Sequence, residues 1–161
     1  MGRWWWPFWA GGDLAAGPLE LPPEQWVRSE GGLGGRPLKT KFNHALKPLA
    51  GRPPWLHFVG ITAFFRHPGE DGLPGEEEAR ELVQLESHLR REFRPDEGAL
   101  TAGVIITGGW AQFVVYAADP EGAKERYRRL RREFPAFELQ LDLVEDSAWA
   151  VYGQFVHSAR R

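Results

Sequence analysis

Two kinds of hydrophobic periodicity alternate along the chain after residue 56, and their order constrains the fold more than any other feature of the sequence. Residues 57–66 are rich in β-branched and aromatic side chains, which predicts a strand. Residues 76–93 carry apolar side chains at three- and four-residue spacing, which predicts an amphipathic helix. Its apolar positions are Ala79, Leu82, Leu85, Leu89 and Phe93. The acidic first turn, Glu76–Glu78, suits the positive end of the helix dipole.

The alternation continues towards the end of the chain. Residues 100–117 predict two strands that meet at Gly108–Gly109, a pair that permits the positive φ angles of a two-residue hairpin turn. A second helix is predicted over residues 119–134, with an aspartate as N-cap and a proline at its first position. Strict alternation over residues 137–143 predicts a last strand, and a short helix containing Trp149 and Tyr152 follows it.

This order, β-α-β-β-α-β, is the split βαβ pattern of the ferredoxin-like fold. We therefore expect an α+β domain with a four-stranded antiparallel sheet, two helices on one face and a short C-terminal helix. Residues 1–56 hold 9 of the 19 glycines and 8 of the 13 prolines, so they are predicted to be mostly irregular, with short strands only at 25–28 and 38–42. The expected domain covers residues 26–158, after an aromatic, Gly/Pro-rich extension over residues 1–25.

The hairpin register predicts which side chains share a face of the sheet. If Gly108–Gly109 form the turn, Thr107 faces Trp110 and Val104 faces Phe113. The core face then carries Leu100, Ala102, Val104, Ile106, Phe113, Val115 and Ala117, and the opposite face carries Thr101, Thr107, Trp110, Gln112 and Tyr116. With the first strand added, the face without helices exposes four aromatic side chains, which are Phe58, Phe64, Trp110 and Tyr116. So much exposed aromatic surface indicates an interaction site.

The N-terminal stretch RWWWPFW is the most unusual local composition in the chain. Four of the eight tryptophans, Trp4, Trp5, Trp6 and Trp9, lie within it. It lacks the Leu/Ala-rich centre of a secretory signal, which favours a cytoplasmic protein, and no apolar run reaches the length of a membrane-spanning helix. A membrane-surface anchor usually adds several basic residues, and this stretch has Arg3 alone. We therefore expect residues 4–9 to pack on the helix-free face of the sheet, in the same chain or in a dimer partner.

Three short motifs carry a resemblance to a known family. They are Gly72-Leu73-Pro74 followed by Glu77 and Glu78, the hairpin from Thr107 to Tyr116, and Asp146 with Trp149 and Tyr152. In these motifs the chain resembles, over roughly residues 26–157, the bacterial family catalogued as domain of unknown function 695. Ala111–Gln112 stand where many members have an Arg-Glu pair, and the resemblance implies a fold but no reaction. The closing Trp-Tyr segment also resembles the bacterial regulator B of ribonuclease E, a protein that inhibits by binding.

The residue types that catalysis or metal binding requires form no recognisable pattern. The chain has no cysteine, which excludes disulfides, thiolate metal sites and cysteine nucleophiles. The spacing of its five histidines favours scattered surface residues over a metal site, and no serine lies in a nucleophile elbow. Glycine-rich residues 31–35 lack the Lys-Ser/Thr of a phosphate-binding loop and favour a flexible connection. The sequence therefore predicts no catalytic residue, no metal and no cofactor.

The charge pattern limits the class of partner. A net charge of −2 argues against duplex nucleic acid. The second predicted helix carries six basic side chains: Lys124, Arg126, Arg128, Arg129, Arg131 and Arg132. These arginines and the aromatic face indicate single-stranded RNA binding as an alternative. However, Glu138 and Asp142 share the face without helices, and the arginines lie on the helical side, which favours a protein partner.

The sequence as a whole predicts a cytoplasmic binding or regulatory module that acts through protein–protein contacts, without intrinsic catalysis. Single-stranded RNA binding is the alternative interpretation, and an unrecognised hydrolase is the third. The partner is an unidentified protein or a second copy of the chain. The candidate interaction surface combines tryptophans, sheet aromatics and helix arginines: Trp4, Trp5, Trp6, Trp9, Phe58, Phe64, Trp110, Tyr116, Arg128, Arg129 and Arg132.

Overall fold

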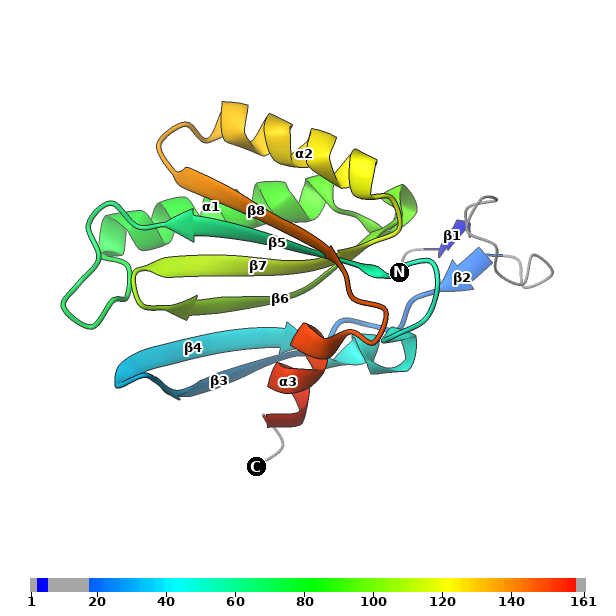
Figure 1. Cartoon of the computed structure of the whole chain (residues 1–161), viewed down its shortest axis with the longest axis horizontal. Coiled ribbons are helices and arrows are strands. Elements are labelled where there is room, and N and C mark those ends of the chain that lie inside the picture. The colour runs from blue at the N-terminus through cyan, green and yellow to red at the C-terminus, as the bar shows by residue number, and fades with distance from the viewer. Residues whose placement is uncertain (1–2, 6–17, 159–161) are drawn as a thin grey trace.

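The computed structural model describes residues 3–5 and 18–158 and is built around one large antiparallel sheet (Figure 1). The sheet has six strands in the order β3-β4-β6-β7-β5-β8. They are β3 (Trp26–Leu33), β4 (Arg36–Asn43), β5 (His57–Phe64), β6 (Ala99–Thr107), β7 (Trp110–Ala117) and β8 (Glu138–Glu145). The helices are α1 (Glu76–Glu92), α2 (Pro120–Glu133) and α3 (Ala150–Ser158), with 3-10 turns η3 (His44–Leu49) and η4 (Pro95–Glu97).

The expected four-stranded, two-helix ferredoxin-like sheet is therefore wrong. The sheet contains two additional strands, the hairpin β3–β4, which joins the sheet through the pairing of β4 with β6. In addition, a third helix, α3, packs on the sheet. The glycine-rich stretch that favours a flexible connection is in fact the end of this hairpin. Gly34 and Gly35 adopt φ angles of +59° and +80°, so they close the two-residue turn that their lack of a side chain permits.

Helices α1 and α2 cover one face of the sheet, where the periodicity predicts them. The core between them joins the apolar stripe of each helix to alternate residues of the strands. Its members are Val59, Ile61, Ala63, Phe65, Leu82, Leu85, Leu89, Phe93, Ala99, Val104, Ala111, Phe113, Val115, Ala117, Ala123, Leu130 and Phe137. Tyr127, Phe134, Leu139, Leu141 and Leu143 pack against this core and are only partly buried.

One predicted strand face is wrong at the start of β6. Leu100 and Ala102 lie on the opposite face from Val104, because the pairing of β6 with β7 shifts between Thr101 and Gly103. Such a β-bulge adds one residue to a strand and inverts the side-chain alternation beyond it. Thr101 therefore lies on the helix-covered face, where its hydroxyl donates a hydrogen bond to the carbonyl of Phe93 at 3.3 Å.

The second face of the sheet, expected to be open, is partly covered. Helix α3 and turn η3 pack there on a second apolar cluster, and Figure 1 shows α3 in front of the right-hand part of the sheet. The cluster contains Phe42, Leu46, Leu49, Trp55, Phe58, Leu100, Ala102, Ile105, Val114, Tyr116, Trp149, Tyr152 and Val156. The ring of Phe42 lies directly over Gly103, where any Cβ would collide with it. Among the described residues, no helix covers the left-hand ends of the strands on this face.

The N-terminal tryptophans are only partly within the described residues. Strand β1 (Arg3–Trp5) pairs with β2 (Pro18–Glu20) in a separate two-stranded sheet beside η4. This places the backbone of Trp4 and Trp5 near Ala99, the first residue of β6. Trp110 of β7 pairs with Thr107, at the other end of β6. Trp6 and Trp9 lie outside the described residues, so packing of residues 4–9 on the sheet stays a prediction. No helix of the described residues is long and apolar enough to cross a membrane.

Candidate interaction surface

The three motifs that resemble the known family lie at the two ends of the second sheet face. At the left-hand end in Figure 1, the loop of residues 66–75 packs on the β6–β7 turn. The amide of Gly109 donates to the carbonyl of Gly72 at 2.8 Å, and the amide of Phe65 donates to the carbonyl of Gly109 at 2.9 Å. Gly72 has φ of +81°, and a Cβ there would meet backbone atoms of Gly108 at 3.1 Å. The glycines are therefore needed for close approach of two backbones.

Glu78 fixes the same loop from the first turn of α1. Its carboxylate is buried and accepts hydrogen bonds from the backbone amides of Arg66 at 2.6 Å and His67 at 3.0 Å. Burial by itself raises the pKa of this carboxyl, but the two amides and the Arg66 guanidinium outweigh it and the pKa lies below its usual range. Of the three glutamates expected to complement the dipole, Glu78 thus has a structural function.

The closing motif forms the α3 cluster, which we define as Tyr116, Asp146, Trp149 and Tyr152. The rings of Tyr116 and Trp149 stack at 4.0 Å, and the Tyr116 hydroxyl donates to Asp146 Oδ2 at 2.9 Å. The backbone amide of Tyr152 donates to that same hydroxyl at 3.2 Å. Burial raises the pKa of both tyrosines, so both stay neutral. The cluster holds α3 on the sheet, and its motif is therefore structural.

At the end of this face that carries the β6–β7 turn lies a part that no described helix covers. We define the open patch as Leu38, Thr40, Phe64, Trp110, Gln112 and Gln140. Cross-strand pairing puts Leu38, Trp110 and Phe64 in one row, through Thr107 of β6. All three side chains are half-buried, and beside them Gln112 Nε2 donates to Thr62 Oγ1 at 3.3 Å. The patch is thus an apolar row beside a row of amides and hydroxyls.

Strand β8 borders the open patch and forms an edge of the sheet. It pairs with β5 over all eight residues, and no other described strand pairs with its outer side. Its side chains alternate: Leu139, Leu141 and Leu143 face α2, whereas Glu138 and Asp142 share the face of Phe64. A shallow groove runs along this edge, lined by Phe64, Tyr127, Arg131, Glu138, Leu139, Gln140 and Leu141.

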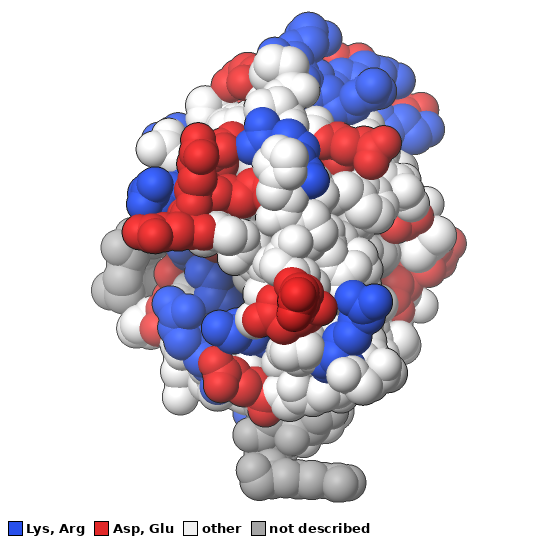
Figure 2. Space-filling model, turned by 90° about the vertical axis from the view of Figure 1, so that its left-hand side faces the viewer, with Lys and Arg blue, Asp and Glu red and all other residues white. Residues whose placement is uncertain are grey.

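Charges of both signs are interspersed around this end of the molecule. Figure 2 views the end that carries the β6–β7 turn and shows uncharged surface with acidic and basic groups around it, one acidic group lying just below the centre. The basic residues of α2 are largely paired with carboxylates. Lys124 pairs with Glu121, Arg126 with Glu97, Arg128 with Glu125 and Arg129 with Glu92, at 2.6–3.1 Å. Four of the six basic side chains of α2 are therefore paired with carboxylates.

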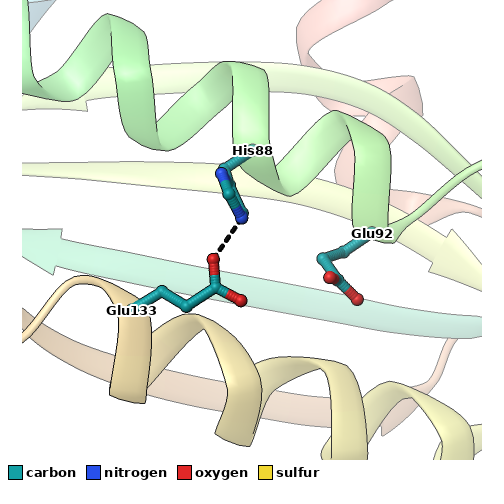
Figure 3. A group of neighbouring side chains, drawn as sticks. All are labelled: His88, Glu92 and Glu133. Atoms are coloured by element: carbon teal, nitrogen blue, oxygen red, sulfur yellow. Dashed lines mark ion pairs between the residues drawn. The ribbon is translucent and has the colours of Figure 1, made fainter.

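A group of potential metal ligands lies on the opposite side of the sheet, between α1 and α2. His88, Glu92 and Glu133 bring one ligand atom each to within 4.8 Å of one another (Figure 3). The spacing of the histidines does not reveal this group, because two of its three ligands are glutamates and one of these lies on the other helix. The signal was a histidine followed four residues later by a glutamate within a predicted helix.

The structure distributes the predicted surface residues over several places. Phe58 and Tyr116 are 6% and 0% exposed beneath α3, so they are not accessible to a partner. Phe64 and Trp110 lie together in the open patch, and Arg128, Arg129 and Arg132 lie on α2 away from it. The alternating pattern predicts β8 and its acidic face, but it gives no sign that β8 is an edge strand of the sheet.

The comparison with known families gives one match. A family model described as a family of unknown function, DUF695, matches residues 24–157. Since this range is most of the chain, the protein belongs to that family. No curated protein matches the chain.

Proposed function

We propose that this DUF695 protein is a regulatory binding module that takes up an extended segment of a protein partner along the outer edge of β8 and the adjoining open patch. The observation that carries the proposal is the edge itself. Eight consecutive residues of β8 pair without interruption on one side and present main-chain groups on the other. The strand contains no proline, lysine or glycine, which are residues that commonly protect an edge from pairing.

The direction of the main-chain groups supports strand addition. The amide of Asp146 donates to the carbonyl of Leu56 at 2.8 Å, which directs the even-numbered residues of β8 towards β5. The amides and carbonyls of Leu139, Leu141 and Leu143 then point outward. The Leu139 carbonyl accepts a hydrogen bond from the Tyr127 hydroxyl at 2.9 Å, which agrees with its pointing away from β5. A partner strand would add further hydrogen bonds of this kind.

The side chains along the edge indicate the chemistry of the partner. Glu138 and Asp142 are exposed, and like charges would oppose the pairing of two copies of β8. Basic residues of a partner strand would complement them. On the α2 side, half-buried Leu139 and Leu141 lie beside Tyr127 and favour apolar residues. The proposed ligand is therefore an extended protein segment in which basic and apolar residues alternate.

The charge distribution favours a protein over RNA. Phosphate groups would meet Glu138 and Asp142 at the edge, and four of the basic side chains of α2 are engaged with carboxylates. The uncharged open patch continues from the edge and would contact a partner through Trp110, Phe64 and the Gln112 amide. We infer regulation by occupancy, in which binding blocks or reshapes the partner.

A defined peptide tests the mode of binding. The probe is a ten-residue peptide of alternating lysine and valine, compared with the matched peptide of glutamate and valine, in calorimetric titrations of the full chain. We expect the basic peptide to bind and the acidic peptide not to bind. The double change Glu138→Lys and Asp142→Lys should reduce affinity about tenfold or more, since each close charge pair contributes on the order of 1 kcal/mol. Glu121→Lys on α2 is the matched control and should bind as wild type.

Photo-cross-linking in cell extract tests the class of partner. A cross-linking residue at Gln140 in the patch should trap a protein that the same residue at exposed Val83 of α1 does not trap. The trapped protein, once purified, should bind wild type and fail to bind the double lysine variant. Equal binding by both proteins, or RNA as the trapped species, would overturn the proposal.

A further inference from the structure

We infer that His88, Glu92 and Glu133 form a binding site for a divalent transition ion of the zinc class, which joins α1 to α2. The inference does not depend on the proposed function, because the site lies on the face of the sheet that α1 and α2 cover, opposite the open patch. Three ligand atoms from the three side chains lie within 4.8 Å of one another. One imidazole nitrogen and two carboxylates are ligands that zinc binds in proteins.

Two neighbouring helices bring these ligands together. His88 and Glu92 are four residues apart on α1, so they lie one turn apart on one face of that helix. Glu133 is the last residue of α2 and reaches across from the neighbouring helix. Figure 3 shows the His88 ring directed at Glu133 and the Glu92 carboxylate directed into the same gap between the helices. The site therefore combines a local pair with one ligand from a distant segment.

The His88 ring is held in the orientation that a ligand needs. Its plane stands at 76° to the ring of Phe134, with ring centres 5.3 Å apart. Nε2 faces the Glu133 carboxylate, and Arg91 Nη2 lies 2.9 Å from Nδ1. Since arginine can only donate, Nδ1 accepts from Arg91, and Nε2 is the ring nitrogen that faces Glu133 and the site.

The neighbouring charges suit a cation of charge +2. Glu92 and Glu133 bring two negative charges, and Arg129 Nη2 neutralises part of this by contacting Glu92 Oε1 at 3.0 Å. The other Glu92 oxygen is left for an ion. The side chains of His88, Glu92 and Glu133 are 30%, 21% and 42% exposed, so ions can reach them from solvent. An imidazole ligand favours zinc or nickel over magnesium or calcium, which prefer oxygen-only sites.

Zinc titration of the full chain, without a histidine tag and after removal of metal with chelator, is the test. We expect one zinc ion per chain in calorimetry. Glu133→Gln and His88→Ala should each weaken binding about tenfold or more, as loss of a ligand does. Glu121→Gln and His157→Ala serve as matched controls outside the site and should bind zinc as wild type does.

A second pair of variants separates a metal site from an ion-pair network. Arg129→Gln removes the cation that competes for Glu92, so it should strengthen zinc binding severalfold. In addition, zinc should raise the melting temperature of wild type but not that of Glu133→Gln, because only the intact site joins both helices. Unchanged zinc affinity in both ligand variants, or no saturable binding by a correctly folded wild type, would overturn the inference and leave an ion-pair network only.

Discussion

The two ends of the second sheet face start from the same kinds of residue and reach different states. At one end, Phe58 and Tyr116 are sealed beneath α3, and at the other end Phe64 and Trp110 remain half-buried. All four belong to the same two paired strands, and each phenylalanine faces one of the other two residues across them. The strands alone therefore do not decide the exposure of these side chains. The residues after β8, which fold back over only one end, decide it.

The same contrast holds for polar groups. In the α3 cluster, the Tyr116 hydroxyl, the Trp149 indole and the Tyr152 hydroxyl all have hydrogen-bond partners at 2.6–2.9 Å. In the open patch, Gln112 Nε2 donates to Thr62 Oγ1 at the longer distance of 3.3 Å, and both Gln112 and Trp110 are only half-buried. A fully bonded, buried cluster stabilises one arrangement, whereas a partly solvated patch can exchange water for a partner. This difference separates the surface that holds α3 in place from the surface that we propose for partner binding.

The largest expected effect comes from removing Trp149. Its side chain is 1% exposed and stacks on Tyr116, so Trp149→Ala should lower the free energy of unfolding by about 3–5 kcal/mol. Urea denaturation followed by circular dichroism measures this loss. Trp110→Ala in the open patch is the control and should cost about 1 kcal/mol. Equal losses in the two variants would contradict the division of the face into two ends.

The next effect tests the hydrogen bonds of the α3 cluster. Tyr116→Phe removes a hydroxyl that donates to Asp146 and accepts from the Tyr152 amide, which leaves both groups without this partner. We expect a loss of about 1–3 kcal/mol in urea denaturation, the cost of unsatisfied buried groups. Tyr127→Phe, which removes a hydroxyl that donates to the β8 edge, is the matched control and should cost less. A smaller loss for Tyr116→Phe than for Tyr127→Phe would show that the cluster contributes packing alone.

The third prediction concerns pH at the open end. Since the pKa of Glu78 is lower in the folded protein than in the unfolded chain, its charge stabilises the fold above the unfolded-state pKa. This contribution is lost as pH falls through the folded-state pKa. Glu78→Gln should therefore be about 1–3 kcal/mol less stable at neutral pH, with the difference shrinking towards acid. Urea denaturation across a pH series measures it, and a constant difference would contradict the assignment.

The smallest stability effect is expected at the N-terminus. Packing of residues 4–9 on the sheet predicts that deletion of residues 1–12 lowers the melting temperature or exposes an apolar patch that binds dye. The described β1 lies beside η4, away from the open patch, so we expect a shift of only about 2–4 °C. Calorimetry of the truncated chain measures the shift. If stability and oligomeric state do not change and only liposome binding is lost, the segment contacts membranes instead.

Much of the local structure was predictable because it depends on local periodicity. The apolar stripes of α1 and α2, the Gly108–Gly109 turn and the pairing of Val104 with Phe113 follow from spacing alone. The bulge near Ala102 was not predictable, since an inserted residue leaves no mark in a run of small and β-branched side chains. Nor was the metal-ligand group, because Glu133 comes from another helix.

The sequence by itself determined the helices, the strands after residue 56 and the existence of a sheet face rich in aromatic residues. Only the tertiary structure decided that Gly34 and Gly35 close a hairpin that widens the sheet, because a glycine pair serves equally in a linker or a turn. Likewise, only the tertiary structure decided that Tyr116 is sealed and Trp110 is not. Periodicity reports which side of an element is apolar, but what covers that side depends on contacts between residues far apart in the chain.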